Sequence, residues 1–191
     1  MKTKYGRLDL ITGNMFSGKT EKLLQLINRA EYKGKKVLIV KYRLDTRYDE
    51  ARIVSHFGRD SKAEPASSVE DINKLIETHK PNLIAIDELQ FFKGSKQAIE
   101  KWLALGIDII ASALSSDVWA QPWPNIGDLM CLADKVYKLT AICLVCKKEA
   151  AYTQLLTDTS KFKDGSNVLI GGKDLYEPRC RNHFTPANPI T

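Results

Sequence analysis

A glycine-rich stretch near the N-terminus constrains the fold of this chain more than any other feature. It reads Gly13-Asn14-Met15-Phe16-Ser17-Gly18-Lys19-Thr20 and matches G-x-x-x-x-G-K-[ST] at every specified position. An apolar run over 8–12 predicts a buried strand before it, and the pattern after it predicts a helix that ends near Gly34. In this order, the backbone N–H groups of the loop can cradle a phosphate. Lys19 would add charge at the outer phosphates, and the Thr20 hydroxyl would hold Mg²⁺. A glycine turn can match by chance, but the flanking strand and helix favour a phosphate loop.

The rest of the chain alternates apolar runs with helical patterns, which predicts a parallel α/β sheet. Further strands are expected over 36–40, 51–57, 83–86, 107–113 and 135–140. Helices are expected after Ser68, after Ser95 and over 126–133. The segments 58–68 and 114–127 are expected to be loops, and an ordered loop as long as the second usually serves a function.

Charge and composition narrow the class of protein. The chain has 191 residues and a net charge of +6, and neither a leader pattern nor a bilayer-length apolar run is present. We therefore expect a cytoplasmic protein with no membrane partner. Residues 1–48 hold twelve Lys or Arg against four Asp or Glu. This asymmetry suits an anionic nucleotide, but charge alone does not predict a nucleic-acid partner.

Two carboxylates follow the apolar strand 83–86. In parallel sheets, ligands bind at the carboxyl ends of the strands, so Asp87 and Glu88 are expected beside the phosphate loop. Asp87 would bind Mg²⁺ together with Thr20, and Glu88 would act as a general base. The base could activate water, as in an ATPase, or a substrate hydroxyl, as in a kinase. A GTPase is disfavoured because Asn73-Lys74-Leu75-Ile76 lacks the aspartate of N/T-K-x-D. A helicase-like motor would need a second lobe, for which too little chain follows residue 140.

Three cysteines and one histidine have the spacing of a metal site. Cys143-x-x-Cys146 and Cys180-x-x-His183 predict a tetrahedral, structural zinc site, because four protein ligands leave no open position. The segment 147–179 must leave the metal and return as a tethered loop. It contains the Gly171-Gly172 pair, which fits a hairpin turn or a substrate lid. The fourth cysteine, Cys131, is expected in the core.

Taken together, these stretches resemble the zinc-containing (type II) thymidine kinase family over roughly residues 7–185. Beyond the phosphate loop, the resemblance rests on Asp45-Thr46-Arg47-Tyr48, Asp87-Glu88-Leu89-Gln90-Phe91-Phe92, Lys138-Leu139-Thr140-Ala141, Cys143-Leu144-Val145-Cys146, Glu149-Ala150-Ala151-Tyr152-Thr153, Ile170-Gly171-Gly172 to Tyr176, and Cys180-Arg181-Asn182-His183.

The resemblance implies a fold, a reaction and a set of partners. The expected fold is α/β, with a RecA-like parallel P-loop domain over 1–140 and a small zinc-ribbon and lasso domain over 141–191. The expected reaction is transfer of the ATP γ-phosphate to the 5′-hydroxyl of thymidine, in a cytoplasmic homotetramer that uses Mg²⁺ with ATP and contains structural Zn²⁺.

The resemblance also implies roles for individual residues. Glu88 matches the general base, Gln90 its neighbour, and Asp45 and Arg47 the charges near the phosphates. The positions around the thymine are Met15, Leu114, Thr153, Val168, Leu169, Ile170, Gly171, Gly172 and Tyr176. Val118 stands where the family has a stacking aromatic residue, with Trp119 next to it, so either position is a candidate for the base platform.

A different class of function stays open from the residues alone. A zinc-ribbon ATPase that binds nucleic acid would carry the same phosphate loop, metal site and basic charge. Its nucleotide binding or hydrolysis would respond to DNA or RNA and not to thymidine.

Overall fold

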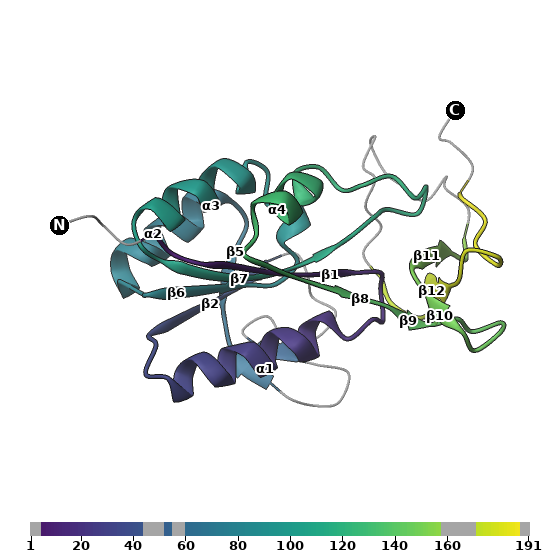
Figure 1. Cartoon of the computed structure of the whole chain (residues 1–191), viewed down its shortest axis with the longest axis horizontal. Coiled ribbons are helices and arrows are strands. Elements are labelled where there is room, and N and C mark those ends of the chain that lie inside the picture. The colour runs from purple at the N-terminus through teal and green to yellow at the C-terminus, as the bar shows by residue number, and fades with distance from the viewer. Residues whose placement is uncertain (1–4, 44–51, 55–59, 158–170, 188–191) are drawn as a thin grey trace.

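A six-stranded parallel sheet forms the centre of the structure, a computed structural model that describes residues 5–43, 52–54, 60–157 and 171–187 (Figure 1). The strand order is β5-β2-β6-β7-β1-β8, and every neighbouring pair is parallel. The strands are β1 (Leu8–Gly13), β2 (Val37–Tyr42), β5 (Glu64–Ala66), β6 (Leu83–Ile86), β7 (Asp108–Leu114) and β8 (Lys135–Leu139). Apolar residues of β1, β2, β6 and β7 are buried on both faces of the sheet, whereas those of the edge strand β8 are only half-buried. The predicted α/β fold is confirmed.

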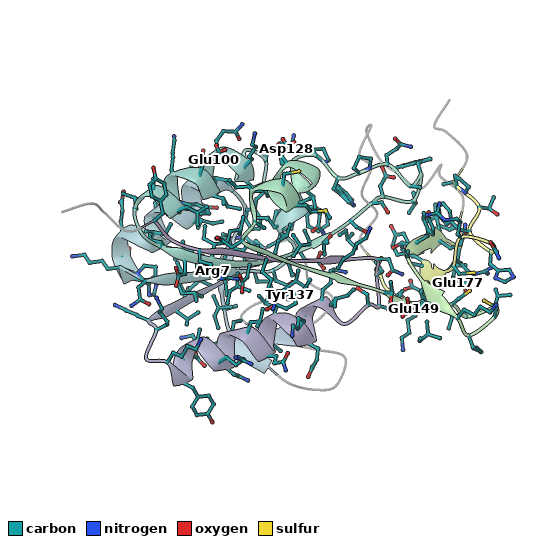
Figure 2. The ribbon with its side chains drawn as sticks, in the orientation of Figure 1. Arg7, Glu100, Asp128, Tyr137, Glu149 and Glu177 are labelled. Carbon is teal, nitrogen blue, oxygen red and sulfur yellow. The ribbon has the colours of Figure 1, made fainter. Side chains whose placement is uncertain are left out.

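Helices cover both faces of the sheet (Figure 1). On one side lies α1 (Lys19–Tyr32), and on the other lie α2 (Val69–His79), α3 (Ser95–Ala104) and α4 (Ile126–Leu132). The inner face of α1 buries Leu23, Leu24 and Ile27, which recur at the helical period. An ion pair of 3.7 Å between Lys96 Nζ and Asp128 Oδ2 links α3 to α4 (Figure 2). The sheet therefore has two apolar cores, one under each helix layer.

The helix ends agree with the local chemistry of the sequence. The Ser68 hydroxyl accepts the N–H of Asp71 at 3.2 Å and caps α2, as predicted. The N–H of Ser67 donates to the Asp71 carboxylate and holds the pKa of that group below its usual value. Gly34 lies in the left-handed region just after α1, where glycine has no steric penalty.

Two sequence predictions were wrong in detail. The segment 58–68 is not only a loop, because β4 (Asp60–Lys62) pairs with β3 (Arg52–Val54) and β5 adds an edge strand to the main sheet. Pro65 lies in β5, where an edge position tolerates a residue without an N–H. Cys131 is exposed on α4 and does not belong to the core, because Ile126 and Leu129 form the buried face of that helix.

Beyond the main sheet, the C-terminal part consists of short antiparallel strands. β9 (Ala141–Ile142) pairs with β10 (Glu149–Ala150), and β11 (Tyr152–Leu155) pairs with β12 (Tyr176–Arg179). Glu177 and Arg179 form an ion pair on β12, at the end of the molecule opposite the N-terminus (Figure 2). The rings of Tyr152 and Phe184 stack with centroids 4.6 Å apart. The division into two domains at residue 140 stays a prediction.

The described helices offer no candidate for a membrane span: none combines the length and the apolar character that a bilayer crossing needs.

Candidate functional site

The glycine-rich loop joins β1 to α1 at the carboxyl end of the sheet, as the sequence predicted. A side chain at Gly13 would bring its Cβ within 2.5 Å of the Leu139 carbonyl oxygen, so only glycine fits there. Gly18 has a φ of 81°, which turns the loop into the helix. The Ser17 hydroxyl and the Lys19 ammonium both donate to the Asn14 carbonyl, each at 2.8 Å. The loop is therefore a closed turn whose first helical residue is the lysine.

Asp87 directly follows β6, which β7 separates from β1 and the phosphate loop. Its Oδ2 is 3.5 Å from Thr20 Oγ1, and its Oδ1 accepts the hydroxyl of Ser112 and the N–H of Glu88. Only 6% of Asp87 is exposed, so these donors stabilise a buried carboxylate. Thr20 Oγ1 and Asp87 Oδ2 are close enough for both oxygens to ligate one divalent cation. Oxygen ligands of this kind suit Mg²⁺.

Glu88 has a backbone conformation that few non-glycine residues adopt, with φ 56°. Such strain persists only where neighbouring contacts hold it, and here Gln90 supplies them. The Gln90 amide nitrogen donates to Glu88 Oε2 at 2.5 Å, and its oxygen accepts the Leu114 N–H at 3.1 Å. Gln90 thus connects the predicted base to the start of the 114–127 loop and fixes the direction of the carboxylate.

Four of the residues predicted to surround a base, namely Met15, Val118, Trp119 and Tyr176, lie together beside the loop. Val118, Leu155 and Tyr176 form a buried cluster, against which Met15 and Trp119 pack, with Phe16, Leu175 and Ala187 at its margin. Both candidates for the base platform, Val118 and Trp119, belong to this cluster. The Asp117 carboxylate fixes their loop by accepting the N–H groups of Trp119 and Gln121, each at 2.9 Å.

Strand β11 is bonded directly to the phosphate loop. The Met15 N–H donates to Thr153 Oγ1 at 3.0 Å, and the Asn14 side-chain amide donates to the Tyr152 carbonyl at 3.1 Å. Thr153 is only 3% exposed. The C-terminal strands therefore hold the loop through two hydrogen bonds that no local sequence pattern indicates.

The predicted metal ligands converge in the C-terminal part. The sulfur atoms of Cys143, Cys146 and Cys180 and a ring nitrogen of His183 all lie within 4.8 Å of one another. Two of the separations are 3.6 Å, from Cys146 Sγ to Cys180 Sγ, and 3.2 Å, from Cys180 Sγ to His183 Nδ1. A tetrahedral zinc with Zn–S bonds of about 2.3 Å separates its sulfur ligands by about 3.8 Å. The donor set and its spacing fit zinc.

The surroundings of these cysteines favour a thiolate at Cys143. Burial acts to raise its pKa, but the backbone N–H groups of Cys146, Cys180 and Val145 outweigh it and lower the pKa to about 6. Among the four ligand residues Cys143 is the fully buried one. Since metals bind the thiolate form, this environment prepares a ligand for a cation.

Some of the remaining predicted site residues are described by the structure, and others lie outside the described residues. Gly171 and Gly172 precede β12, and the Gly172 carbonyl accepts the N–H groups of Leu175 and Tyr176 in a tight turn. Asp45, Arg47, Val168, Leu169 and Ile170 lie outside the described residues.

Sequence reasoning missed one polar residue of the site, Ser112, and one buried lysine, Lys41, on a strand beside β6. Ser112 donates to Asp87, and its position within the apolar strand β7 is the signal that could have identified it. Lys41 is 3% exposed near the end of β2, and its position in an apolar strand is the same kind of signal.

A parallel sheet with a phosphate loop after β1 and carboxylates after β6 defines a P-loop α/β protein. The family model for thymidine kinase matches residues 6–184. The chain therefore belongs to the thymidine kinase family. Membership implies a kinase, with ATP and thymidine as its substrates.

Proposed function

We propose that this chain transfers the γ-phosphate of ATP to the 5′-hydroxyl of thymidine, which salvages thymidine as its monophosphate. One observation carries the proposal: Glu88 directly follows Asp87, Asp87 pairs with Thr20 of the phosphate loop, and the cluster that includes Met15 and Tyr176 packs at the same loop. The first can move a proton, the second can hold a metal-bound triphosphate, and the third offers an apolar site of the kind that binds a planar base.

The phosphate end of the site depends on the loop and its cations. Backbone N–H groups at the start of α1 and the Lys19 ammonium would bind the ATP phosphates, with Asp45 and Arg47 nearby. Thr20 and Asp87 would hold Mg²⁺, which neutralises charge on the phosphates when it is bound. The Ser112 hydroxyl keeps the Asp87 carboxylate aimed at Thr20.

The acceptor end of the site depends on Glu88. In the proposed reaction, its carboxylate takes the proton from the 5′-oxygen of the nucleoside as that oxygen attacks the γ-phosphate in line. Gln90 orients the carboxylate through its amide nitrogen. Leu114, Thr153, Tyr176 and the backbone of 168–172 would enclose the base, with Val118 or Trp119 as its platform.

Zinc would be held by Cys143, Cys146, Cys180 and His183, and with four protein ligands it would supply stability rather than chemistry. The site lies at the base of the segment 147–179, so a bound ion would fix both ends of the segment that covers the nucleoside. The proposed protein has two domains, over 1–140 and 141–191, and it is a cytoplasmic homotetramer.

A panel of nucleosides tests the proposed function. The purified protein is incubated with Mg-ATP and each nucleoside in turn, and the products are separated by chromatography. We expect phosphorylation of thymidine at its 5′ position. Release of inorganic phosphate without any phosphorylated nucleoside would refute the proposal and favour an ATPase. If DNA or RNA stimulated that release, the protein would be a zinc-ribbon ATPase that binds nucleic acid.

A further inference from the structure

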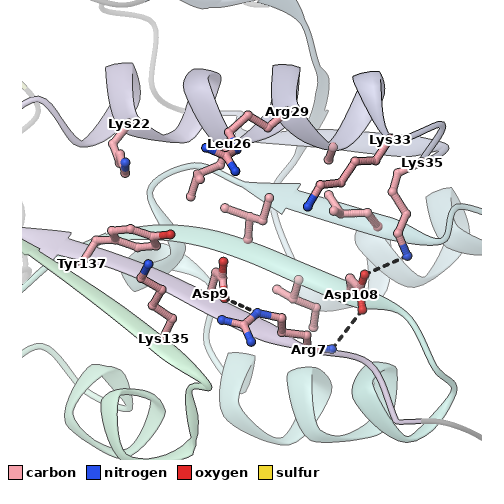
Figure 3. Close-up of a pocket in the computed structure, with 14 residues that line it drawn as sticks. Arg7, Asp9, Lys22, Leu26, Arg29, Lys33, Lys35, Asp108, Lys135 and Tyr137 are labelled. Carbon is pink, nitrogen blue, oxygen red and sulfur yellow. Dashed lines mark hydrogen bonds and ion pairs between the residues drawn. The ribbon is translucent and has the colours of Figure 1, made fainter.

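A second concave surface lies between α1 and the face of the sheet that this helix covers (Figure 3). The groove has a volume of about 580 Å³ and is lined by one side of α1 from Lys22 onward and by residues near the starts of β1, β6, β7 and β8 (Figure 3). It extends from Lys22, in the first turn after the phosphate loop, to Arg7, just before β1. A groove of this volume is within the range of small-molecule sites.

Cations dominate the lining of this groove. Six of its residues are basic, namely Arg7, Lys22, Arg29, Lys33, Lys35 and Lys135, and two are acidic. Both acids are engaged: Asp9 pairs with Arg7 at 2.8 Å, and Asp108 pairs with Lys35 at 2.9 Å (Figure 3). The groove therefore has an excess of four positive charges.

The excess cations come from two elements that face each other across the groove. Lys22, Arg29 and Lys33 recur at intervals of seven and four residues and lie along one stripe of α1. Lys135 approaches from β8 on the other side (Figure 3). Within the described parts of the chain, none of the four is paired with a carboxylate.

The ring of Tyr137 contacts two of these cations. The ammonium nitrogens of Lys22 and Lys135 lie 4.7 and 4.6 Å from the centre of its ring. An anion that enters the groove near this ring would be attracted by both ammonium groups. The cations also occupy the Tyr137 ring, which leaves it unsuited to stacking on a base. Recognition in this groove therefore depends on charge and not on an aromatic platform.

From this geometry we propose that the groove is a second anion site, which binds a small molecule through a di- or triphosphate group. A compact polyphosphate carries several negative charges in a short length, which matches four cations around a groove of limited volume. The ligand is either a nucleotide or inorganic polyphosphate, which share this chemistry. Such binding would be insensitive to the identity of a nucleotide base.

Binding of inorganic tripolyphosphate to the full chain tests the proposal. Titration calorimetry is done in a Lys19→Ala background, which weakens binding at the phosphate loop. The double variant Arg29→Gln/Lys33→Gln should bind about tenfold more weakly, because two charge contacts are lost. The control Lys93→Gln/Lys101→Gln removes the same charge from exposed positions near and on α3, across the sheet from α1. Equal binding by both double variants would overturn the proposal.

Lysine footprinting supplies a readout that needs no variant. The rate of acetylation of Lys22 and Lys135 is measured by mass spectrometry, with Lys93 as an internal reference. Tripolyphosphate should slow acetylation of Lys22 and Lys135 but not of Lys93, and ATP and GTP should do so equally if the ligand is a nucleotide. Protection by inorganic polyphosphate alone would identify that source.

Three outcomes would overturn the proposal. Unchanged acetylation with every anion would mean that the groove binds none of them. Slow acetylation of Lys22 and Lys135 before any anion is added would mean that another surface, such as a second copy of the chain, covers the groove. Tighter binding of a single-stranded oligonucleotide than of tripolyphosphate, lost in the Arg29→Gln/Lys33→Gln variant, would mean that the groove serves a nucleic acid instead. None of these outcomes depends on thymidine phosphorylation.

Discussion

The hydrogen bond between Met15 in the phosphate loop and Thr153 in β11 leads to a quantitative prediction. Thr153→Val keeps the shape of the side chain but removes the oxygen that accepts the Met15 N–H at 3.0 Å. Because Thr153 is 3% exposed, water cannot easily replace that oxygen. A buried N–H without a partner costs about 1–3 kcal/mol. The variant should lose that amount in stability, in loop order, or in both.

Two measurements separate these effects. The midpoint of urea unfolding reports the stability, and the dissociation constant of ATP reports the order of the loop. If the whole cost falls on the loop, ATP binding weakens by about 5- to 150-fold. Thr153→Ser keeps the hydroxyl and serves as the matched control, so it should bind ATP nearly as wild type does. Unchanged unfolding and unchanged ATP binding in Thr153→Val would show that this bond does not support the loop.

Two further predictions concern the polar contacts of the site and the metal ligands. Ser112→Ala removes a donor to the buried Asp87 carboxylate, so the Mg²⁺ concentration needed for half-maximal activity should change. Ser112→Thr keeps the hydroxyl and should behave as wild type does. An unchanged Mg²⁺ requirement in Ser112→Ala would argue against a positioning role. Cys146→Ala removes one of four converging ligands, so the zinc content should fall and proteolysis of 141–187 should accelerate. The control Cys131→Ala changes an exposed cysteine outside the ligand set and should alter neither quantity. Full zinc content in Cys146→Ala would contradict the predicted ligand set.

The parts of the fold that depend on local pattern could be predicted from the sequence. The loop from Gly13 to Thr20 follows from glycine positions and from the strand and helix beside it. Asp87 and Glu88 follow from their place after an apolar strand, because parallel strands deliver such residues to one edge. The four metal ligands follow from the spacing of two pairs. In each case the pattern consists of residues that are close together in the sequence.

The contacts that join distant segments could not be predicted in this way. Ser112 reaches Asp87 only because β6 and β7 pair with Ile86 opposite Ala111, and no pattern in the sequence specifies that register. Thr153 reaches Met15 across 138 positions in the chain. The groove under α1 likewise depends on which side of β8 carries Lys135 and Tyr137. Sequence alone indicated an excess of positive charge but not where it gathers.

The central claim is that Glu88 removes a proton from the nucleoside while the neighbouring loop holds ATP. Glu88→Gln tests it most directly, because glutamine keeps the size of the side chain and can still accept the Gln90 amide. Single-turnover transfer of labelled γ-phosphate from ATP to thymidine is measured in both proteins, together with ATP binding. The account predicts unchanged ATP binding and a rate lower by about 100-fold or more. Transfer to thymidine at nearly the wild-type rate would contradict it.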